Sequence, residues 1–234
     1  MPFLLDMPDL AMSKILDHLE FQSILSFQKV SRNVYDYVND KKPDLKLKKI
    51  EIDMEPSRVT VILKCHSQKK PIRIRYQDHV FGCQVSFENR ITVVEDASFL
   101  NVFYRDILQY AQHQKSILKE FSLKAQRVPE EIKGVLSFKA KKVTVSTSCQ
   151  KDILDILSCF GDLSSISVYN IGENSRWTLD DRWMTSGQSL IVRGFQFDIP
   201  VTRICHYDNI DIWMTEVSAR DLWFLKEVSG IIKS

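Results

Sequence analysis

The sequence predicts an α+β fold, and three observations support this prediction. Residues 5–39 contain three short amphipathic helical patterns in close succession. Residues 45–95 alternate between apolar and polar side chains, and a helical pattern follows. From residue 118, short β-like runs recur with helical connectors between them. We therefore expect a three-helix region at 1–42, an antiparallel sheet with a linking helix at 43–115, and an α/β repeat region with a mainly parallel sheet at 116–234.

The first helical pattern begins near Pro8, a residue that the first turn of a helix tolerates. Asp6 and Asp9 flank it, and their charges suit the positive end of the helix dipole. Apolar residues then recur at helical spacing, first at Met12, Ile15, Leu16 and Leu19, next at Ile24, Leu25 and Phe27, and finally at Val30, Val34, Tyr37 and Val38. The breaker at residues 39–43 ends the third helix.

So small a helical cluster has two ways to cover its apolar surface. Chains below roughly 40 residues usually need a metal, a disulfide or a partner to be stable. The cluster therefore packs on the rest of the chain, or it offers apolar residues to another protein. Periodicity alone leaves both alternatives open.

The next region predicts a small antiparallel sheet with one solvated face. Its alternating apolar positions are Ile50, Ile52 and Met54, then Val59, Val61 and Leu63, then Ile72, Ile74 and Tyr76, and then Cys83, Val85, Phe87, Ile91 and Val93. Turns are expected at residues 55–57 and 88–90. A helix should cover the sheet with Phe99, Leu100, Phe103, Ile107, Tyr110 and Ala111.

The remaining chain resembles a leucine-rich repeat in its spacing. The β-like runs are centred at Phe121 and Leu123, Val143 and Val145, Ile166 and Val168, Leu190 and Val192, and Ile210 and Ile212, which gives spacings of 22, 23, 24 and 20 residues. Helices are expected after Pro129, at residues 153–157 before Gly161, and after a capping box from Ser218 to Asp221. Strands joined by single helices should lie parallel. Because Asn170 comes one position before the place of the usual repeat asparagine, we expect a leucine-rich-repeat-like region rather than a regular horseshoe.

The N-terminal helices resemble an F-box, the module that binds the adaptor in Skp1, cullin and F-box ubiquitin ligases. The resemblance rests on the order and spacing of Met7-Pro8, Ile15-Leu16, Leu19, Ile24-Leu25 and Val30-Ser31-Arg32. Two positions depart from the usual pattern: Met7 replaces the leading Leu, and Leu10 occupies the usual acidic position. Methionine is close to leucine in volume, and Asp9 can still serve the helix start. The resemblance implies that Met7, Pro8, Ile15, Leu16, Leu19, Leu25 and Val30 contact a Skp1-like adaptor and through it a cullin.

The residues after these helices are similar to the nematode F-box A proteins. The similarity rests on residues 42–52, Glu55-Pro56-Ser57 and residues 59–63. In that family the C-terminal half is the FTH, or fog-two homology, domain. The resemblance implies a substrate-recognition subunit of a ubiquitin ligase, with a target protein of unknown identity bound by the C-terminal region. It leaves open the alternative of a non-ligase scaffold that recruits a regulatory protein. By analogy with the family name, that regulatory protein could be an RNA-binding protein.

Composition excludes several other classes of protein. The hydrophobic fraction of 44% and charged fraction of 26% are typical of a globular chain, and a net charge of +2 gives no reason to expect nucleic acid or an acidic membrane as partner. No signal peptide or membrane span is evident, so we expect an intracellular protein of the cytoplasm, the nucleus or both. The five cysteines are widely spaced without a C-x-x-C pair, and we expect reduced thiols and no metal or other cofactor.

No motif predicts an enzyme. Cys205, His206 and Asp208 are the most suggestive set, but adjacent residues of a strand point to opposite faces, and the same objection applies to Cys65 and His66. Basic clusters at residues 46–49, 69–75 and 139–142 are read as solvated faces. Trp177, in a polar loop at residues 172–176, is the better candidate for a target-binding aromatic, whereas Trp183 is expected in the core.

Overall fold

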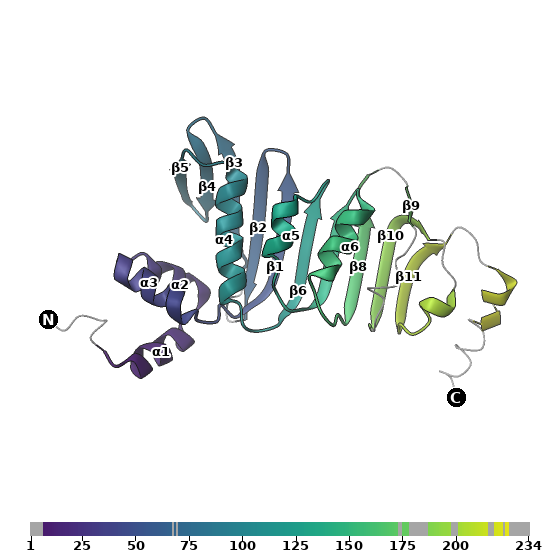
Figure 1. Ribbon diagram of the computed structural model, residues 1–234, viewed down its shortest axis with the longest axis horizontal. Helices are drawn as coiled ribbons and strands as arrows, with labels where there is room; N and C mark the ends of the chain where they lie inside the picture. The colour runs from purple at the N-terminus through teal and green to yellow at the C-terminus, as the bar shows by residue number, and fades with distance from the viewer. Residues whose placement is uncertain are drawn as a thin grey trace. The chain divides into compact units, whose positions relative to one another are not determined.

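The computed structural model describes residues 7–66, 68, 70–172, 175–177, 187–197, 201–214, 218–221, 223 and 224, with the backbone alone for 175–177, 196, 197, 201, 213 and 214. Two compact units divide the chain, one formed by residues 1–51 and 57–118 and the other by residues 52–56 and 119–234. Each unit combines helices with a sheet, as Figure 1 shows, so the predicted α+β class is confirmed.

The first unit begins with the three predicted helices, α1 (Asp9–His18), α2 (Phe21–Gln28) and α3 (Arg32–Lys41). Pro8 is the residue before α1 rather than part of its first turn, and its carbonyl oxygen accepts hydrogen bonds from Ala11 and Met12. Ser31 caps α3, since its hydroxyl accepts a hydrogen bond of 3.3 Å from the Val34 amide. The helices share a small core of buried side chains, namely Met12, Leu16, Phe21, Ile24, Val34 and Val38.

The helical cluster packs on the rest of its unit. Phe21 meets Tyr110 edge to face, with 5.4 Å between the ring centroids. The side-chain oxygen of Asn39 accepts hydrogen bonds from Gln28 at 3.1 Å and from Gln109 at 3.3 Å. These contacts tie α2 and α3 to the helix that contains Gln109 and Tyr110, so the cluster shares a core with residues far along the chain.

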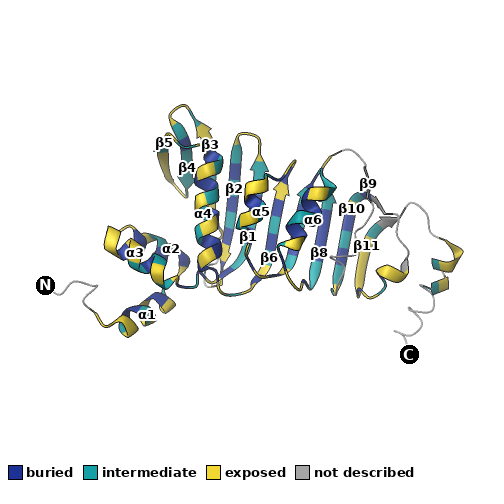
Figure 2. Cartoon of the chain, in the orientation of Figure 1, coloured by how far each residue is buried: buried dark blue, intermediate teal, exposed yellow. Residues whose placement is uncertain are grey.

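That helix is α4 (Phe99–His113), and it lies across the strands of the first unit (Figure 1). The strands are β1 (Leu47–Glu55), whose residues from 52 on belong to the second unit, β2 (Arg58–Cys65), β3 (Ile72–His79), β4 (Gly82–Phe87) and β5 (Arg90–Glu95), in that order across the sheet. Pairing of β2 with β3, β3 with β4 and β4 with β5 is antiparallel, as predicted. Buried and solvated positions alternate along β2 and β3, as the bands of colour in Figure 2 show, and α4 contacts β2, β3 and β4.

Two side chains hold the segment that leads from α3 to β1. The Oδ1 atom of Asp44 accepts hydrogen bonds from the amides of Lys46, Lys115 and Ser116 and from the Ser116 hydroxyl, at 3.0 to 3.3 Å. The side chain of Gln114 exchanges two hydrogen bonds with the backbone of Leu47, of 3.0 and 3.1 Å, in the manner of a neighbouring strand. These hydrogen bonds therefore hold the segment between α3 and β1 in place and join the helical cluster to the sheet.

The second unit contains β6 (Leu118–Ala125), α5 (Glu130–Val135), β7 (Ala140–Thr147), α6 (Gln150–Ser158), β8 (Ser165–Asn170), β9 (Ser175–Trp177), β10 (Ser189–Phe197), the 3-10 turn η3 (Val201–Arg203) and β11 (Asn209–Met214). Its strands lie in the order β6, β7, β8, β10, β11, with β9 beside β10. Pairing among β7, β8, β10 and β11 is parallel, and Val143, Ile166, Leu190 and Ile210 are register partners in turn. The predicted strand centres and the parallel arrangement are thus confirmed.

Asn170 occupies a distinctive place in this ladder. Its side-chain amide donates to the Gly194 carbonyl at 2.9 Å, and its side-chain oxygen accepts from the Gly172 amide at 2.9 Å. Gly194 has a φ of +76°, and a Cβ atom there would lie 3.0 Å from the Asn170 Cβ. A side chain at position 194 would therefore be strained and crowded, which explains the glycine. The leucine-rich-repeat-like character stays a prediction, as does the three-part division into 1–42, 43–115 and 116–234.

Several details differ from the sequence-based expectations. Residues 175–177 form β9 where a polar loop was expected, because they pair with β10. Helix α6 ends at Ser158, three residues before Gly161. A 3-10 turn, rather than an α-helix, is the helical element described between β10 and β11. The predicted capping box is present, since the Asp221 amide donates to the Ser218 hydroxyl at 3.1 Å.

Candidate functional site

Large apolar side chains are exposed on α1 and beside the first two helices. Leu10 is 71% exposed and Val30 is 66% exposed, and Met7 and Ile15 are exposed to a smaller extent. Several exposed apolar side chains on one small module favour a protein-binding role for it. We call Met7, Leu10, Ile15 and Val30 the exposed apolar set.

Some apolar residues of α1 are buried in the core of the helical cluster, and others are accessible to solvent. Leu16 is 1% exposed and belongs with Met12 to the core of the helical cluster, whereas Ile15 lies beside that core with part of its side chain in solvent. Leu19 is half-buried and Pro8 is exposed. Among the residues predicted to contact an adaptor, the structure therefore leaves Met7, Pro8, Ile15 and Val30 accessible and uses Leu16 for folding.

Helix α2 has two distinct faces. Phe21, Ile24 and Gln28 are buried in the core. Gln22, Leu25 and Ser26, together with Lys29 at the end of the helix, line a pocket against the sheet, and Val30 follows at an exposed position. Leu25, which was predicted to contact the adaptor together with Val30, is half-buried and lines this pocket.

The start of α1 is held by contacts from α3. Asp9 accepts hydrogen bonds of 2.7 Å from the Tyr37 hydroxyl and from the Lys41 ammonium group. These hydrogen bonds, with that from Lys41 having the larger effect, lower the pKa of Asp9. Ionised Asp9 also suits the positive end of the helix dipole. The arrangement fixes the direction in which α1 presents Leu10 and Ile15.

The sequence analysis missed two features of this region. Leu10 was treated as a departure from the family pattern, and it is the most exposed apolar residue of α1. A helical projection places it on the side opposite Met12 and Leu16, so periodicity carried the signal. The pocket behind α2 was also missed, because β3 to β5 lie about 50 to 70 residues further along the chain than α2 and their position depends on tertiary packing.

The structure describes the residues that were considered for chemistry. The five cysteines are free thiols, as expected. Burial, with a smaller effect of Glu20, raises the pKa of Cys65 to about 11, which is opposite to what a reactive thiolate requires. Residues 204–206 form a turn rather than a strand, and the Cys205 thiol donates to the Thr202 carbonyl oxygen at 3.2 Å. Within the described part of the chain, no group of three or more His, Cys, Asp or Glu side chains could hold a metal ion.

The two tryptophan predictions are not tested. The backbone of Trp177 lies in β9, but its side chain is outside the described residues. Trp183 lies outside them as well.

Comparison with protein families decides what the helical cluster is. The three helices, their shared core and the exposed apolar set all fall within one family model. Residues 4–46 match the F-box domain. The F-box of this chain thus comprises α1, α2, α3 and the start of the segment held by Asp44. F-box proteins are typically non-catalytic adaptor subunits.

Comparison with curated proteins and with solved structures finds no significant match. Among the residues that the structure describes, no helix is both long and apolar enough to cross a membrane. The F-box match is therefore the finding on which a functional proposal for this chain rests.

Proposed function

We propose that this protein is the substrate-recognition subunit of a Skp1, cullin and F-box type ubiquitin ligase. The F-box match at residues 4–46 carries the proposal, since this module binds a Skp1-like adaptor and through it a cullin. The exposure of Met7, Leu10, Ile15 and Val30 supports it, because the packed F-box retains apolar side chains for a partner. The protein supplies no chemistry of its own and acts by holding a target near the ubiquitin-charged enzyme.

The remainder of the chain has the role of target binding in this proposal. The resemblance to nematode F-box A proteins and their FTH domain favours the second unit for that role, with Trp177 as a possible contact residue. The proteins of this ligase class work in the cytoplasm and the nucleus, and we place this chain there. No described feature favours nucleic acid, a membrane or a cofactor as partner.

The exposed apolar set gives the direct test. A double substitution, Leu10→Asp with Ile15→Asp, puts charge on residues that contribute little to the core of the helices. The matched control, Val80→Asp with Phe81→Asp, alters two exposed apolar residues, 87% and 70% exposed, which lie outside the F-box. Loss of interface anchors costs roughly 2 kcal/mol or more, so the first variant should bind a Skp1-like adaptor about 30-fold more weakly.

Co-purification of the full chain with the adaptor measures this difference. The control variant should bind as the unaltered chain does, and circular dichroism should show both variants folded. Equal binding by all three proteins would contradict the proposal. A bound target whose level is unchanged by proteasome inhibition would point instead to a non-ligase scaffold.

A further inference from the structure

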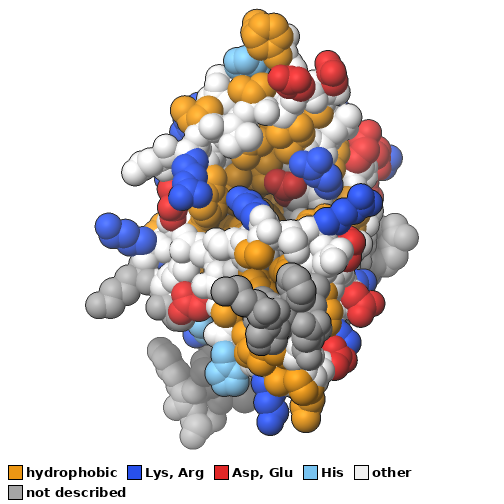
Figure 3. Space-filling model, turned by 90° about the vertical axis from the view of Figure 1, so that its left-hand side faces the viewer, with side chains coloured by type: hydrophobic (Ala, Val, Ile, Leu, Met, Phe, Trp, Pro, Cys, Tyr) orange, Lys and Arg blue, Asp and Glu red, His pale blue; other side chains and the backbone are white. Residues whose placement is uncertain are grey.

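The pocket behind α2 has the size and composition of a binding site. Its volume is about 670 Å³, within the range of roughly 300 to 1,000 Å³ that is usual for ligand sites. Side chains from α2, α3, α4 and β3 to β5 line it, and apolar ones, Leu25, Ile74, Val85 and Phe87, contribute from both sides. Figure 3 shows a hollow on this side of the molecule, with hydrophobic side chains and an acidic side chain in it and basic side chains around its rim. We call it the α2–β5 groove.

The groove exists because α4 leaves part of the sheet uncovered. Helix α4 contacts β2, β3 and β4, and β5 follows β4 at the end of the strand order. On β4 and β5, Val85 pairs with Thr92 and Phe87 with Arg90, and these four side chains all line the groove. The opposite wall is α2, which is fastened to the sheet by a hydrogen bond of 2.8 Å from Gln22 to Glu88. The walls of the groove are therefore a helix and paired strands, which contact each other.

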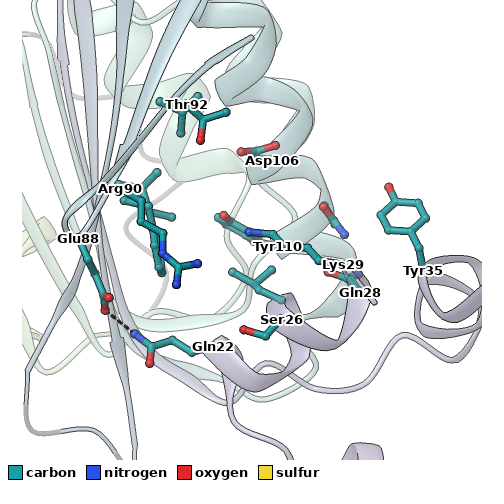
Figure 4. Close-up of a pocket in the computed structure, with 15 residues that line it drawn as sticks. Gln22, Ser26, Gln28, Lys29, Tyr35, Glu88, Arg90, Thr92, Asp106 and Tyr110 are labelled. Carbon is teal, nitrogen blue, oxygen red and sulfur yellow. Dashed lines mark hydrogen bonds between the residues drawn. The ribbon is translucent and has the colours of Figure 1, made fainter. Parts of the chain in front are cut away.

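The charged side chains of the groove differ in whether they are already engaged. Glu88 accepts the hydrogen bond from Gln22, and Asp106 accepts one of 2.9 Å from the Tyr76 hydroxyl and lies 3.5 Å from the Arg105 guanidinium. Lys29 and Arg90 are exposed and make no hydrogen bond or ion pair within the described part of the chain. Figure 4 shows these two cations on opposite sides of the pocket. The exposed charges of the groove are therefore two cations, Lys29 and Arg90, and one carboxylate, Glu88, whereas Asp106 is half-buried.

We propose that the α2–β5 groove binds an extended acidic segment of a target protein, with a carboxylate between Lys29 and Arg90 and apolar neighbours against Phe87 and Leu25. A carboxylate suits this place because it can pair with Lys29 or Arg90, neither of which makes a hydrogen bond or ion pair within the described part of the chain, while Lys29 is also attracted by Asp106. The groove is open and continuous with solvent-exposed β5, which favours a polypeptide segment over an enclosed small molecule. This inference rests on the proposed function in taking the ligand to be a target of the ligase, and it adds a target-binding site in the first unit to the role proposed for the second unit.

A peptide array tests the charge preference with the full-length chain. The probes are nine-residue peptides that carry Leu and Phe on either side of a central Glu, Gln, Lys or phosphoserine. The unaltered chain should retain the Glu peptide at least about fivefold more strongly than the Gln peptide. Stronger retention of phosphoserine than of Glu would identify a phosphorylated segment as the source of the negative charge.

Charge reversal ties that preference to the groove. The double variant Lys29→Glu with Arg90→Glu should lose the preference for the Glu peptide and retain the Lys peptide more strongly. The control Lys14→Glu, at an exposed position of α1, should keep the preference for the Glu peptide. Equal retention of Glu and Gln peptides, no retention of any peptide, or a preference that survives the double reversal would overturn the inference. A dimer of the chain that dissociates on Arg90→Glu would also overturn it, since a second copy would then be the occupant.

The same variants distinguish this inference from the proposed function. Lys29→Glu with Arg90→Glu should still co-purify with the Skp1-like adaptor, since Leu10 and Ile15 are unaltered. Peptide selectivity without any adaptor binding would support the groove and contradict the ligase role. Adaptor binding without peptide selectivity would support the ligase role and contradict the inference about the groove.

Discussion

Substitution of Asp44 tests how the F-box is joined to the sheet. Its Oδ1 atom accepts four hydrogen bonds, and the two from Ser116 lie in a part-buried place where water replaces them poorly. The two from Lys46 and Lys115 are exposed, so water can take over that role. Since a part-buried hydrogen bond to a charged acceptor contributes about 1 to 1.5 kcal/mol, Asp44→Ala should lower the free energy of unfolding by about 2 to 3 kcal/mol.

Two measurements and two controls make the test specific. Urea denaturation followed by circular dichroism should show the loss of stability, and hydrogen exchange should show about 30-fold faster exchange at the Lys115 and Ser116 amides. Asp44→Asn, which keeps an acceptor oxygen, should have a smaller effect, and Asp40→Ala, at an exposed position of α3, should change stability by less than about 0.5 kcal/mol. If Asp44→Ala were no more destabilising than Asp40→Ala, the reasoning about this junction would be refuted.

Three further predictions concern buried ionisable groups. Lys133, whose side chain is 10% exposed, pairs with Glu130, Asp152 and Asp155. Lys133→Met should therefore lower the midpoint of urea unfolding more than Lys151→Met, a control at an exposed position of α6. Equal midpoints for the two variants would contradict this prediction. The pKa of His113 is lowered by burial and, to a smaller extent, by Lys42 and Lys115. His113 therefore binds a proton at higher pH in the unfolded chain than in the folded chain, and the free energy of unfolding should fall as the pH drops below about 6.5. His113→Gln should reduce this pH dependence, and an unaltered dependence would show that His113 is not its source. The raised pKa of Cys65 predicts slower alkylation by iodoacetamide at pH 8 in the folded chain than in urea, as read by peptide mass spectrometry, whereas equal rates would indicate an accessible thiolate.

Local patterns in the sequence predicted most of the secondary structure. Met12 and Leu16 at helical spacing, and Ile72, Ile74 and Tyr76 at strand spacing, are buried as their periodicity requires. The regular strand spacing from Phe121 to Ile210 also predicted a parallel arrangement, because a crossover connection returns the chain to the same end of the sheet. These features depend on residues that are near one another in the sequence.

The features that sequence could not supply depend on tertiary contacts. Leu16 and Ile15 are both apolar and adjacent, and only packing shows that Leu16 belongs to the core while Ile15 remains accessible. Leu25 reads as one more apolar residue of α2, yet the position of β4 and β5 places it in the groove. The short strand β9 forms because β10 lies beside it, so its polar sequence gave no indication of a strand.

The adaptor footprint on the full chain tests the central claim most directly. Hydrogen exchange of this protein, measured with and without a Skp1-like adaptor, should show added protection in peptides that cover residues 7–31, where the exposed apolar set lies. Peptides that cover β3 to β5 should be unchanged by the adaptor. Absence of added protection at residues 7–31, under conditions where the adaptor binds a known F-box, would contradict the assignment of this chain to the ligase.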